Sequence, residues 1–524
     1  MKKSLIIVRV AMLFVACIFL SACETMDNPV ESVAEKSIVI LFESDSHSEL
    51  SGYPKIAGLR DAINKSDTAW AGTVCCGDFL QGGAAASISK GKFIIDIMNA
   101  VGYDVVTLGN HELEYSGANM ESLLGQLGSP VVCANFFRYG ESTSLYPAYV
   151  TRQYGDKHVA FIGVLTPETI VTQMFAFFDG EGTQLYDLTD EGLSAMIQNV
   201  VDDARSKGAD YVVVLSHMGE NSNIAMTSHD LIKTTRGIDV VLDGHTHTSV
   251  PHVYVNNIDN KPVLVSQSGN KFQHIGKLVI NSNGEFSTTL LSTGDIAESN
   301  ASVAAKVAEV ETEVNNLANV VVCHSDFPLI SIGVDGNAIS TTQETAIGNL
   351  LVDAYRDVFK ADIALQAGIT LSADIAAGDI TKRDLMNLLP YEDQMYLIEV
   401  KGDLLLQTLE KCTKSLPKSD LYFPQSSGLK YTVHMKSDTV TDVMVLDHAS
   451  SEYKPLDLEK NYQVAVSGFY ASVGFYGILK DCKVAKTDTR TSRDVLERYL
   501  SVTLNKQLSS DYKATQGRIT IIDD

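Results

Sequence analysis

The chain has 524 residues, more than one hydrophobic core normally accommodates, so we expect at least two domains. Hydrophobic residues make up 45% and charged residues 20%, which indicates a globular rather than a disordered protein. The formal net charge of -24 argues against nucleic acid and anionic lipid as main partners, because both require a basic surface. Such an acidic protein binds phosphate compounds only through local sources of positive charge, and metal ions are one such source.

The first 22 residues are predicted to be a targeting segment and not part of the fold. Lys2 and Lys3 give a positive start, and an apolar run at 11–20, too short to span a bilayer, follows them. The run ends in Leu-Ser-Ala-Cys at 20–23, which resembles the bacterial lipobox and predicts that Cys23 carries lipid. A plain secretory signal with an incidental Cys is the alternative.

In the lipoprotein interpretation, residues 23–36 are the lipidated Cys and a polar tether. The protein would then lie in the cell envelope, on the outer membrane or its periplasmic face, and touch the membrane only through this anchor. Six further Cys residues are scattered along the rest of the chain, so a disulfide scaffold is not expected. Cys75 and Cys76 lie in an apolar run and are predicted to be core residues.

Residues 37–297 alternate short apolar runs with amphipathic, helix-like segments such as Lys92–Val101. The runs are rich in Val and Ile, which suits buried strands, and the alternation predicts a layered α/β domain. Its last part, Gly276–Leu291, is predicted to be a hairpin with Asn283-Gly284 as the turn. The main predicted strands are Ser37–Phe42, Gly72–Cys76, Asp104–Leu108, Pro130–Cys133, His158–Val164, Tyr211–Leu215, Val240–Leu242 and Pro262–Val265.

Residues 298–325 are predicted to be a linker helix, because the stretch from Glu298 to Asn319 is rich in Ala, Val and Glu and lacks Gly and Pro. Residues 326–524 carry a second pattern, with a helix at Thr345–Val358 and a strand at Met395–Val400 among its elements. This pattern predicts a C-terminal α+β domain.

Polar blocks follow five of the predicted strands. In open α/β sheets the ligand crevice lies beyond the carboxyl ends of the strands, so we expect the blocks to converge on one edge. Unrelated polar strand ends are the alternative, and any single block carries little information, but all five in order form a strong signal. The blocks are Asp45-Ser46-His47, Gly77-Asp78, Gly109-Asn110-His111-Glu112, Ser216-His217 and Asp243-Gly244-His245-Thr246-His247.

The residue types in these blocks fit one task. Carboxylate, imidazole and amide oxygen are suitable ligands for Zn, Mn, Fe or Co. Seven such side chains are too many for one ion and suit two divalent ions that share a carboxylate. A metal pair lowers the pKa of a bound water and neutralises phosphoryl oxygens, so the set predicts hydrolysis of phosphate esters.

The five blocks resemble the calcineurin-like metallophosphatase superfamily, and the chain over about 36–520 resembles the bacterial 5′-nucleotidase / UDP-sugar hydrolase family. The resemblance implies an N-terminal α/β/β/α metallophosphatase domain, a linker helix and a C-terminal substrate-recognition domain. It further implies that His111 is the catalytic His and that Glu114 stands where the family often carries an Asp partner to it. The implied ligands are Asp45, His47, Asp78 and His247 for one ion, and Asp78, Asn110, His217 and His245 for the other.

The C-terminal domain departs from this family in its nucleotide-binding residues. Ala367 and Ser372 stand where the family carries Asn and Arg, and Thr341, Thr342 and Gln343 precede Glu344 where an Arg is usual. Ser and Thr cannot replace the bidentate contact that Arg makes with phosphate.

An aromatic pair sandwiches the base in the family that the chain resembles. Phe423 matches one member of the pair, and Phe475 or Tyr476 is the candidate for the other. Packing in the core is the alternative for all three rings.

The sequence thus predicts an extracytoplasmic, metal-dependent phosphoester hydrolase that acts on nucleotides or related phosphate esters through a metal-activated hydroxide. Its partners would be a small phosphorylated substrate and two divalent ions, and the sequence assigns no oligomeric state. Two alternatives stay open: a phosphorylated substrate that is not a nucleotide, and a surface binding protein with a residual hydrolase domain. The complete ligand set argues against the second alternative.

Overall fold

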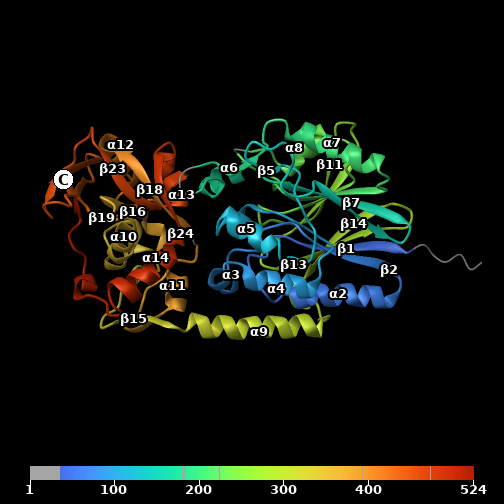
Figure 1. Ribbon diagram of the computed structural model, residues 1–524, viewed down its shortest axis with the longest axis horizontal. Coiled ribbons are helices and arrows are strands. Elements are labelled where there is room, and N and C mark those ends of the chain that lie inside the picture. Colours follow the sequence, from blue (N-terminus) through green and yellow to red (C-terminus); the bar gives the residue numbers. More distant parts are fainter. Residues whose placement is uncertain (1–35, 180–182, 224, 335, 392, 473) are drawn as a thin grey trace, which may run out of the picture. The chain divides into compact units, whose positions relative to one another are not determined.

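The computed structural model of the chain describes residues 36–524, except residues 180–182, 224, 335, 392 and 473 (Figure 1). The predicted signal peptide, Cys23 and the tether up to residue 35 lie outside the described residues. Within the described part of the chain, no helix is long and apolar enough to cross a membrane.

The N-terminal domain is built on two six-stranded sheets. The first sheet contains, in spatial order, β14 (Phe286–Ser292), β13 (His274–Ile280), β1 (Ser37–Glu43), β2 (Ala69–Cys75), β3 (Val105–Thr107) and β4 (Val131–Val132). The second contains β11 (Ser249–Asn256), β12 (Pro262–Ser268), β10 (Val240–Asp243), β9 (Tyr211–His217), β7 (Lys157–Leu165) and β6 (Tyr149–Tyr154). A small separate sheet pairs β5 (Phe136–Arg138) with β8 (Tyr186–Leu188).

The direction of the strands decides where the predicted ligands meet. Strands β1 to β4 run parallel to one another, and so do β7, β9, β10 and β12. The carboxyl ends of β1, β2 and β3 therefore lie at one edge of the first sheet, and those of β9 and β10 at one edge of the second. The predicted hairpin is present as β13 and β14, with Gly284 in the left-handed region at φ 83°.

The two sheets pack face to face, because their strands present apolar side chains on alternate faces. Along β1, Ile38, Ile40 and Phe42 join the core between the sheets, whereas Val39 and Leu41 join a second core beneath the helices. Every one of these five side chains is buried. The apolar run predicted as a strand is thus buried on both of its faces.

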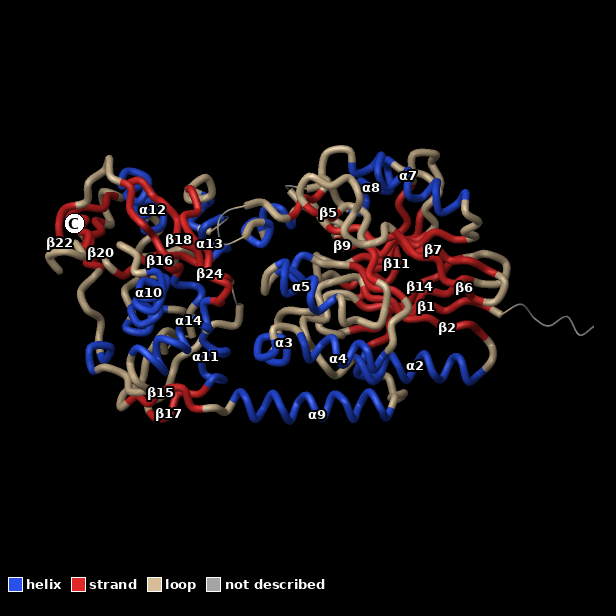
Figure 2. Tube along the Cα trace, in the orientation of Figure 1, coloured by secondary structure: helices blue, strands red, loops and turns tan. Residues whose placement is uncertain are grey.

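Helices cover the outer faces of both sheets (Figure 2). Those packed into the core of the first sheet are α2 (Tyr53–Ser66), α3 (Ala84–Ser89), α4 (Lys92–Val101), α5 (Gly117–Leu124) and α9 (Ala301–Ala318). Those packed into the core of the second sheet are α7 (Leu193–Ser206) and α8 (Ser228–Thr234). Short turns at α6 (Thr169–Thr172), η1 (Asn110–Leu113), η2 (Met174–Phe177) and η3 (Thr293–Asp295) complete the domain. The predicted α/β/β/α layering is confirmed.

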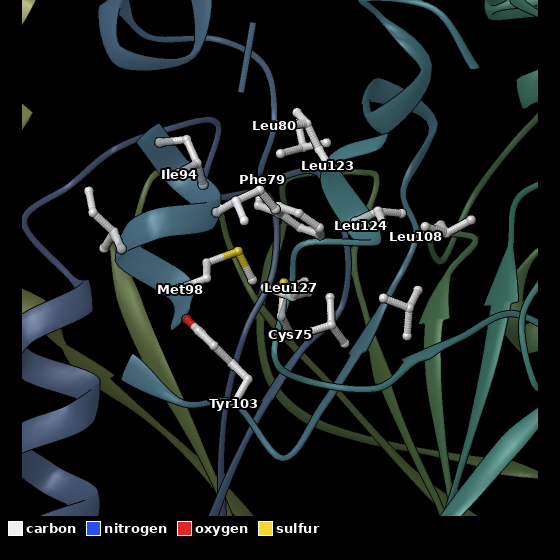
Figure 3. Close-up of a cluster of buried hydrophobic side chains, with 14 of the residues drawn as sticks. Cys75, Phe79, Leu80, Ile94, Met98, Tyr103, Leu108, Leu123, Leu124 and Leu127 are labelled. Carbon is white, nitrogen blue, oxygen red and sulfur yellow. The ribbon is translucent and has the colours of Figure 1, made fainter. Parts of the chain in front are cut away.

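The core under the first sheet fixes the loop that carries Asp78. Phe79 and Leu80, the two residues after it, are fully buried against Ile94 and Met98 of α4 and Leu123 of α5 (Figure 3). A buried aliphatic or aromatic side chain contributes about 1.5–3 kcal/mol to the stability of the folded state. The polar strand end is therefore held in place by apolar side chains next to it in the sequence.

The linker helix is shorter than the predicted 298–325. Helix α9 begins at Ala301, where the Asn300 side chain accepts hydrogen bonds from Ser302 N and Val303 N, and it ends at Ala318. Residues Val321–Ser325 instead form β15, which pairs with β17 (Gly378–Thr381). The β-branched run at 320–322 favours a strand over a further turn of helix.

The C-terminal domain mixes sheets and helices, in agreement with the predicted α+β class. Its five-stranded sheet contains, in spatial order, β19 (Pro424–Ser427), β16 (Ile363–Ala367), β23 (Asn461–Ser467), β18 (Gln394–Lys401) and β24 (Lys483–Thr491). Its four-stranded sheet contains β22 (Tyr453–Pro455), β21 (Thr439–Leu446), β20 (Leu429–His434) and β25 (Ile519–Ile522), and β15 pairs with β17 (Gly378–Thr381). The helices are α10 (Ala346–Phe359), α11 (Lys382–Leu388), α12 (Gly402–Thr413), α13 (Gly468–Ser472) and α14 (Ser492–Arg498).

The cysteines of the described residues are all unpaired. Cys75 and Cys76 are fully buried, one in each of the two cores that flank β2, as the sequence predicts. They contribute to packing and lie outside the group of candidate metal ligands.

Candidate metal centre

Five of the seven predicted ligands lie in strained backbone at the ends of strands. Their φ angles lie between 44° and 79°, in the left-handed region that residues other than Gly rarely adopt. These residues are Asp45, His47, Asp78, His245 and His247. Each such residue costs of order 1–3 kcal/mol and persists where the surrounding structure enforces it. This strain turns successive side chains of a short loop toward one point.

Hydrogen bonds tie the first two loops together. Asp45 N donates to Gly77 O at 3.0 Å, and His47 N donates to Asp78 O at 3.0 Å. Gly77 itself has a φ of 93°, and a Cβ there would lie 2.4 Å from Gly109 N. Only Gly fits at this crossing, so the Gly-Asp pair of the sequence motif has a structural reason.

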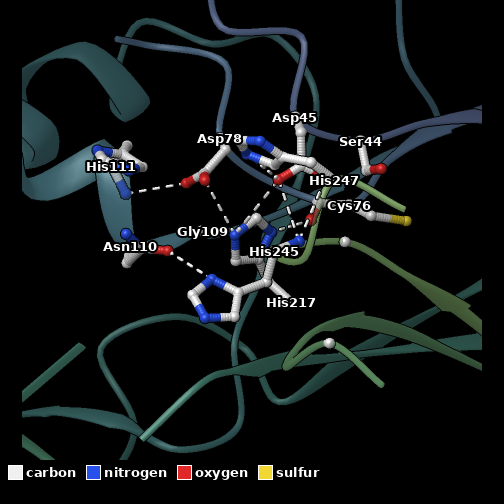
Figure 4. A network of polar contacts seen from close by, with 12 residues as sticks. Ser44, Asp45, Cys76, Asp78, Gly109, Asn110, His111, His217, His245 and His247 are labelled. Carbon is white, nitrogen blue, oxygen red and sulfur yellow. Dashed lines mark hydrogen bonds and ion pairs between the residues drawn. The ribbon is translucent and has the colours of Figure 1, made fainter. Parts of the chain in front are cut away.

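The side chains converge as shown in Figure 4. Asp45, His47, Asp78 and His247 each place one potential ligand atom within 4.8 Å of all the others. The two imidazoles of this group meet with Nε2 of His47 only 2.9 Å from Nε2 of His247. These four are the residues that the family resemblance assigned to one ion.

The second predicted ligand group shares Asp78 with the first. His217 Nε2 lies 3.1 Å from Asp78 Oδ2 and 3.9 Å from Asp45 Oδ1. His245 Nδ1 lies 3.0 Å from Asn110 Oδ1, and the rings of His217 and His245 are 5.4 Å apart. The structure thus brings all seven predicted ligands into one cluster with Asp78 at its centre.

The chemistry of these donors fits divalent cations. His217 Nδ1 donates to Cys76 O at 2.7 Å, so Nε2 is the ring nitrogen that faces Asp78 and that a cation can bind in place of its proton. That buried Nε2 has no hydrogen bond of acceptable geometry, although Asp78 Oδ2 is near. His47 Nδ1 donates to Gln81 Oε1 at 3.2 Å, so its Nε2 is left as an acceptor. Imidazole lone pairs facing buried carboxylates are the arrangement that a cation completes.

Burial and charge shift the pKa values of this cluster strongly. Burial raises the pKa of Asp45 to about 7 and lowers that of His47 to about 4. For Asp78 burial acts to raise the pKa, but His217 and His111 outweigh it and hold the pKa well below its ordinary value. For His217 burial acts to lower the pKa, and Asp78 reverses this and raises it to about 10. Such opposed shifts within a few ångströms are typical of functional sites.

His111, to which the family resemblance assigns the catalytic role, lies beside the cluster. Its backbone N donates to Asp78 Oδ1 at 2.9 Å, and its Nδ1 donates to Glu114 Oε2 at 2.9 Å. The longer side chain of Glu114 therefore still reaches the ring. Burial acts to lower the pKa of His111, but Asp78 and Glu114 outweigh it and raise the pKa to about 9.

The three candidate aromatic rings differ in burial: two are in the core and one is partly exposed. Phe423 and Phe475 are fully buried in the core of the C-terminal domain, so packing, the alternative considered for them, describes both rings. Tyr476 is half-exposed, with its hydroxyl donating to Asp420 Oδ2 at 2.9 Å and Lys411 Nζ 5.0 Å from its ring centroid. Of the three rings, Tyr476 alone keeps a face on the surface.

Several residues that position the cluster were not predicted as site residues. Gln81 orients His47, and Glu168 Oε2 lies 3.1 Å from His245 Nε2. Glu112 is buried and accepts hydrogen bonds from the backbone N–H groups of four residues. These are Asp78 (2.9 Å), Phe79 (2.8 Å), Leu80 (3.1 Å) and Gly109 (2.5 Å). Its place in the Gly-Asn-His-Glu block was the one available signal.

We expect Glu112→Gln to lower the free energy of unfolding by about 2–3 kcal/mol, because an amide cannot accept from all four N–H groups. Bound metal should fall with it, since the loop of Asp78 loses its anchor. Thermal unfolding and metal analysis measure the two effects, with the exposed Glu141→Gln as control. A melting temperature equal to that of the control would show that this carboxylate does not hold the loop.

Two protein families match most of the described chain. The family model "Calcineurin-like phosphoesterase" matches residues 38–249, and "5′-nucleotidase, C-terminal domain" matches residues 321–479. The chain is 24% identical over 488 residues to the 5′-nucleotidase of Bos taurus, covering 84% of this chain and 81% of that protein.

Two further relatives extend this comparison. The trifunctional nucleotide phosphoesterase protein YfkN of Bacillus subtilis is 23% identical over 484 residues, 83% of this chain, but the match spans only 32% of that longer protein. Among solved structures, a 5′-nucleotidase precursor from Thermus thermophilus superposes with a TM-score of 0.59 at 23% identity, covering 93% of this chain and all of the other. At 23% identity, the superposition on the Thermus thermophilus structure shows a shared fold and no more.

Proposed function

Because the chain belongs to the 5′-nucleotidase family, with a calcineurin-like phosphoesterase domain followed by a 5′-nucleotidase C-terminal domain, we propose that it hydrolyses small phosphate esters, nucleotides among them, with two divalent ions. One observation carries the proposal: seven potential metal ligands from five strand ends form one cluster, with Asp78 among the other six, and four of the seven make a compact group. Two ions would supply a water of lowered pKa and positive charge for the phosphoryl oxygens.

The protein's own groups divide the remaining work. Asp45, His47, Asp78 and His247 would hold one ion, and Asp78, Asn110, His217 and His245 the other. The pKa of His111 is raised to about 9, so the ring is protonated near neutral pH: Nδ1 donates to Glu114, and Nε2–H is left to donate to an oxygen of the ester. Glu114 fixes the orientation of this ring and acts as a positioning residue.

A phosphate ester that is not a nucleotide is the second candidate substrate, and the C-terminal domain favours it. Ser372 is exposed, and its hydroxyl donates to Thr370 O at 3.4 Å, where the resembled family carries an Arg. Thr341 is buried and donates to Ala338 O. Without these guanidinium groups, the recognition of a nucleotide phosphate has to come from the metals alone.

A substrate panel tests both candidates. Purified protein is assayed for phosphate release from mononucleotides, UDP-sugars, cyclic nucleotides and sugar phosphates, with Mn or Zn added and metal content measured. Turnover of at least one class, abolished by a chelator, is expected. Preference for sugar phosphates over AMP would select the second candidate, and absence of both metal and turnover would exclude a hydrolase.

We further propose that the protein is a lipoprotein of the cell envelope. The support is the positive start, the apolar run at 11–20 and the lipobox-like residues ending in Cys23. Metabolic labelling with a radioactive fatty acid should mark the protein, and Cys23→Ser should remove the label. A labelled Cys23→Ser variant would show that the lipid, if any, is attached elsewhere.

A further inference from the structure

The C-terminal domain contains a cavity of about 540 Å³ that shares no residue with the candidate metal centre. It lies between the end of α10, the sheet formed by β20, β21 and β22, and the segment that leads into β25. Its volume falls within the range of roughly 300–1,000 Å³ that small-molecule sites occupy. The walls are polar and charged, with Tyr453 and Tyr499 as the aromatic side chains among them.

The charges that line this cavity do not balance. Four cationic side chains face two carboxylates, in a chain whose net charge is -24. Arg518 Nη2 donates to Asp353 Oδ2 at 2.7 Å, and Lys360 pairs with Asp357, so both carboxylates already have partners. Arg356 and Lys430 have no carboxylate within ion-pair distance among the described residues. Because the protein as a whole is acidic, this local excess of positive charge in the cavity wall indicates a site for an anion.

Arg356 is held with its donor fork free. Its Nε donates to Asp362 O at 3.1 Å, which fixes the plane of the guanidinium. The backbone of Gly428, at φ +71°, packs against this group: a Cβ there would lie 2.8 Å from Nε and 2.1 Å from Asp362 O. The two terminal nitrogens make no hydrogen bond in the described part of the chain. A pre-oriented fork of this kind matches the two oxygens of a carboxylate or phosphate.

Lys430 is the second cation without a carboxylate partner among the described residues, and its ammonium group packs against an aromatic ring. Its Nζ lies 4.6 Å from the ring centroid of Tyr453, a cation–π contact that leaves the ammonium hydrogens available to oxygen acceptors. Tyr453 and Lys430 are both partly buried, so an anion between them would be only partly screened by water.

We propose that this cavity binds a small organic anion through a phosphate or carboxylate group, with Arg356 and Lys430 as the principal contacts. The site is separate from the metal centre, and the proposal does not depend on the function of that centre. Its volume leaves room for an organic body about as large as a mononucleotide.

Isothermal titration of the purified protein tests the proposal, with inorganic phosphate and succinate as separate probes. Each titration is run on the metal-loaded protein and again after chelation, because phosphate bound by the metal centre disappears on chelation. We expect one class of binding to survive chelation. Arg356→Gln combined with Lys430→Gln should weaken it about tenfold or more, since each lost bond to a charged group matters strongly.

Matched variants distinguish a specific loss of binding from a loss of folding. Arg356→Lys keeps the charge and loses the fork, so a partial loss of affinity is expected. Lys414→Gln removes one charge from an exposed position outside the cavity and should leave binding unchanged. Hydrolysis of p-nitrophenyl phosphate should be unaffected in all of these variants.

The two probes also identify the chemistry of the head group. Binding of phosphate alone would assign the cavity to phosphorylated ligands, and binding of succinate alone or of both would include carboxylates. The proposal is overturned if neither probe binds the chelated protein, or if the double variant binds both as tightly as Lys414→Gln does.

Discussion

Replacing Asp78 by Asn should lower kcat/KM for phosphate esters by about 10³-fold or more, the largest effect expected of any single substitution in this protein. Asp78 Oδ2 lies 3.1 Å from His217 Nε2 and 3.9 Å from His47 Nε2, so its carboxylate faces ligands of both predicted ions. Asn keeps the shape of the side chain but loses its negative charge. Both ions then lose the ligand that they share, and the cluster loses the anion that compensates them.

Metal content and activity should fall together in this variant. Each is measured on the same preparation, by elemental analysis and by phosphate release. Asp259→Asn, at an exposed position, is the matched control and should behave as wild type. Retention of more than a tenth of the activity with a full complement of metal would contradict the bridging role of Asp78.

The layers of the N-terminal domain could be predicted because buried parallel strands leave a local signature. Apolar runs such as Tyr211–Leu215 are strands in the structure within a few residues of their predicted bounds. Strand β11 (Ser249–Asn256) was not predicted, because at the sheet edge most of its residues are exposed or only partly buried and it contains Pro251. Edge strands gain their conformation from the neighbour they pair with, here β12, and not from their own hydrophobicity.

The convergence of the seven predicted ligands was predictable for a different reason. They sit at the carboxyl ends of parallel strands, where topology alone brings separate segments together. The role of Glu112 was not predictable, because it depends on backbone N–H groups 32 to 34 residues earlier that only tertiary folding brings into reach. Glu168 follows no motif, and only the fold places it beside His245.

For the aromatic residues of the C-terminal domain, position in the sequence did not decide between core packing and base stacking. Phe423 and Phe475 occupy family-like positions in the sequence, but their rings bury large apolar areas in the core. An aromatic side chain serves packing and stacking equally well, so its residue type does not separate the two roles. Burial separates them, and burial follows from the packing of the whole domain.

We expect His111→Asn to lower kcat by about 10²–10³-fold while leaving the metal content unchanged. The pKa of His111 is raised to about 9, so the imidazole carries a second proton; with Nδ1 bonded to Glu114, Nε2–H is the group left to donate a proton to the leaving oxygen. The hydrogen bond of His111 to the cluster comes from its backbone N–H to Asp78, which the substitution keeps. The loss should therefore concern the chemical step and not the metals.

Leaving groups of different basicity separate this role from a structural one. A leaving group such as p-nitrophenolate needs little protonation, whereas the alkoxide released from AMP or a sugar phosphate needs a proton. The defect of His111→Asn should therefore be several-fold larger for the alkyl phosphate. Glu114→Gln keeps a hydrogen-bond acceptor for Nδ1 but loses the charge, so a smaller loss with the same preference is expected. If both substrates lose activity equally in His111→Asn, the ring stabilises phosphoryl charge and does not donate the proton, because only proton donation depends on the basicity of the leaving group.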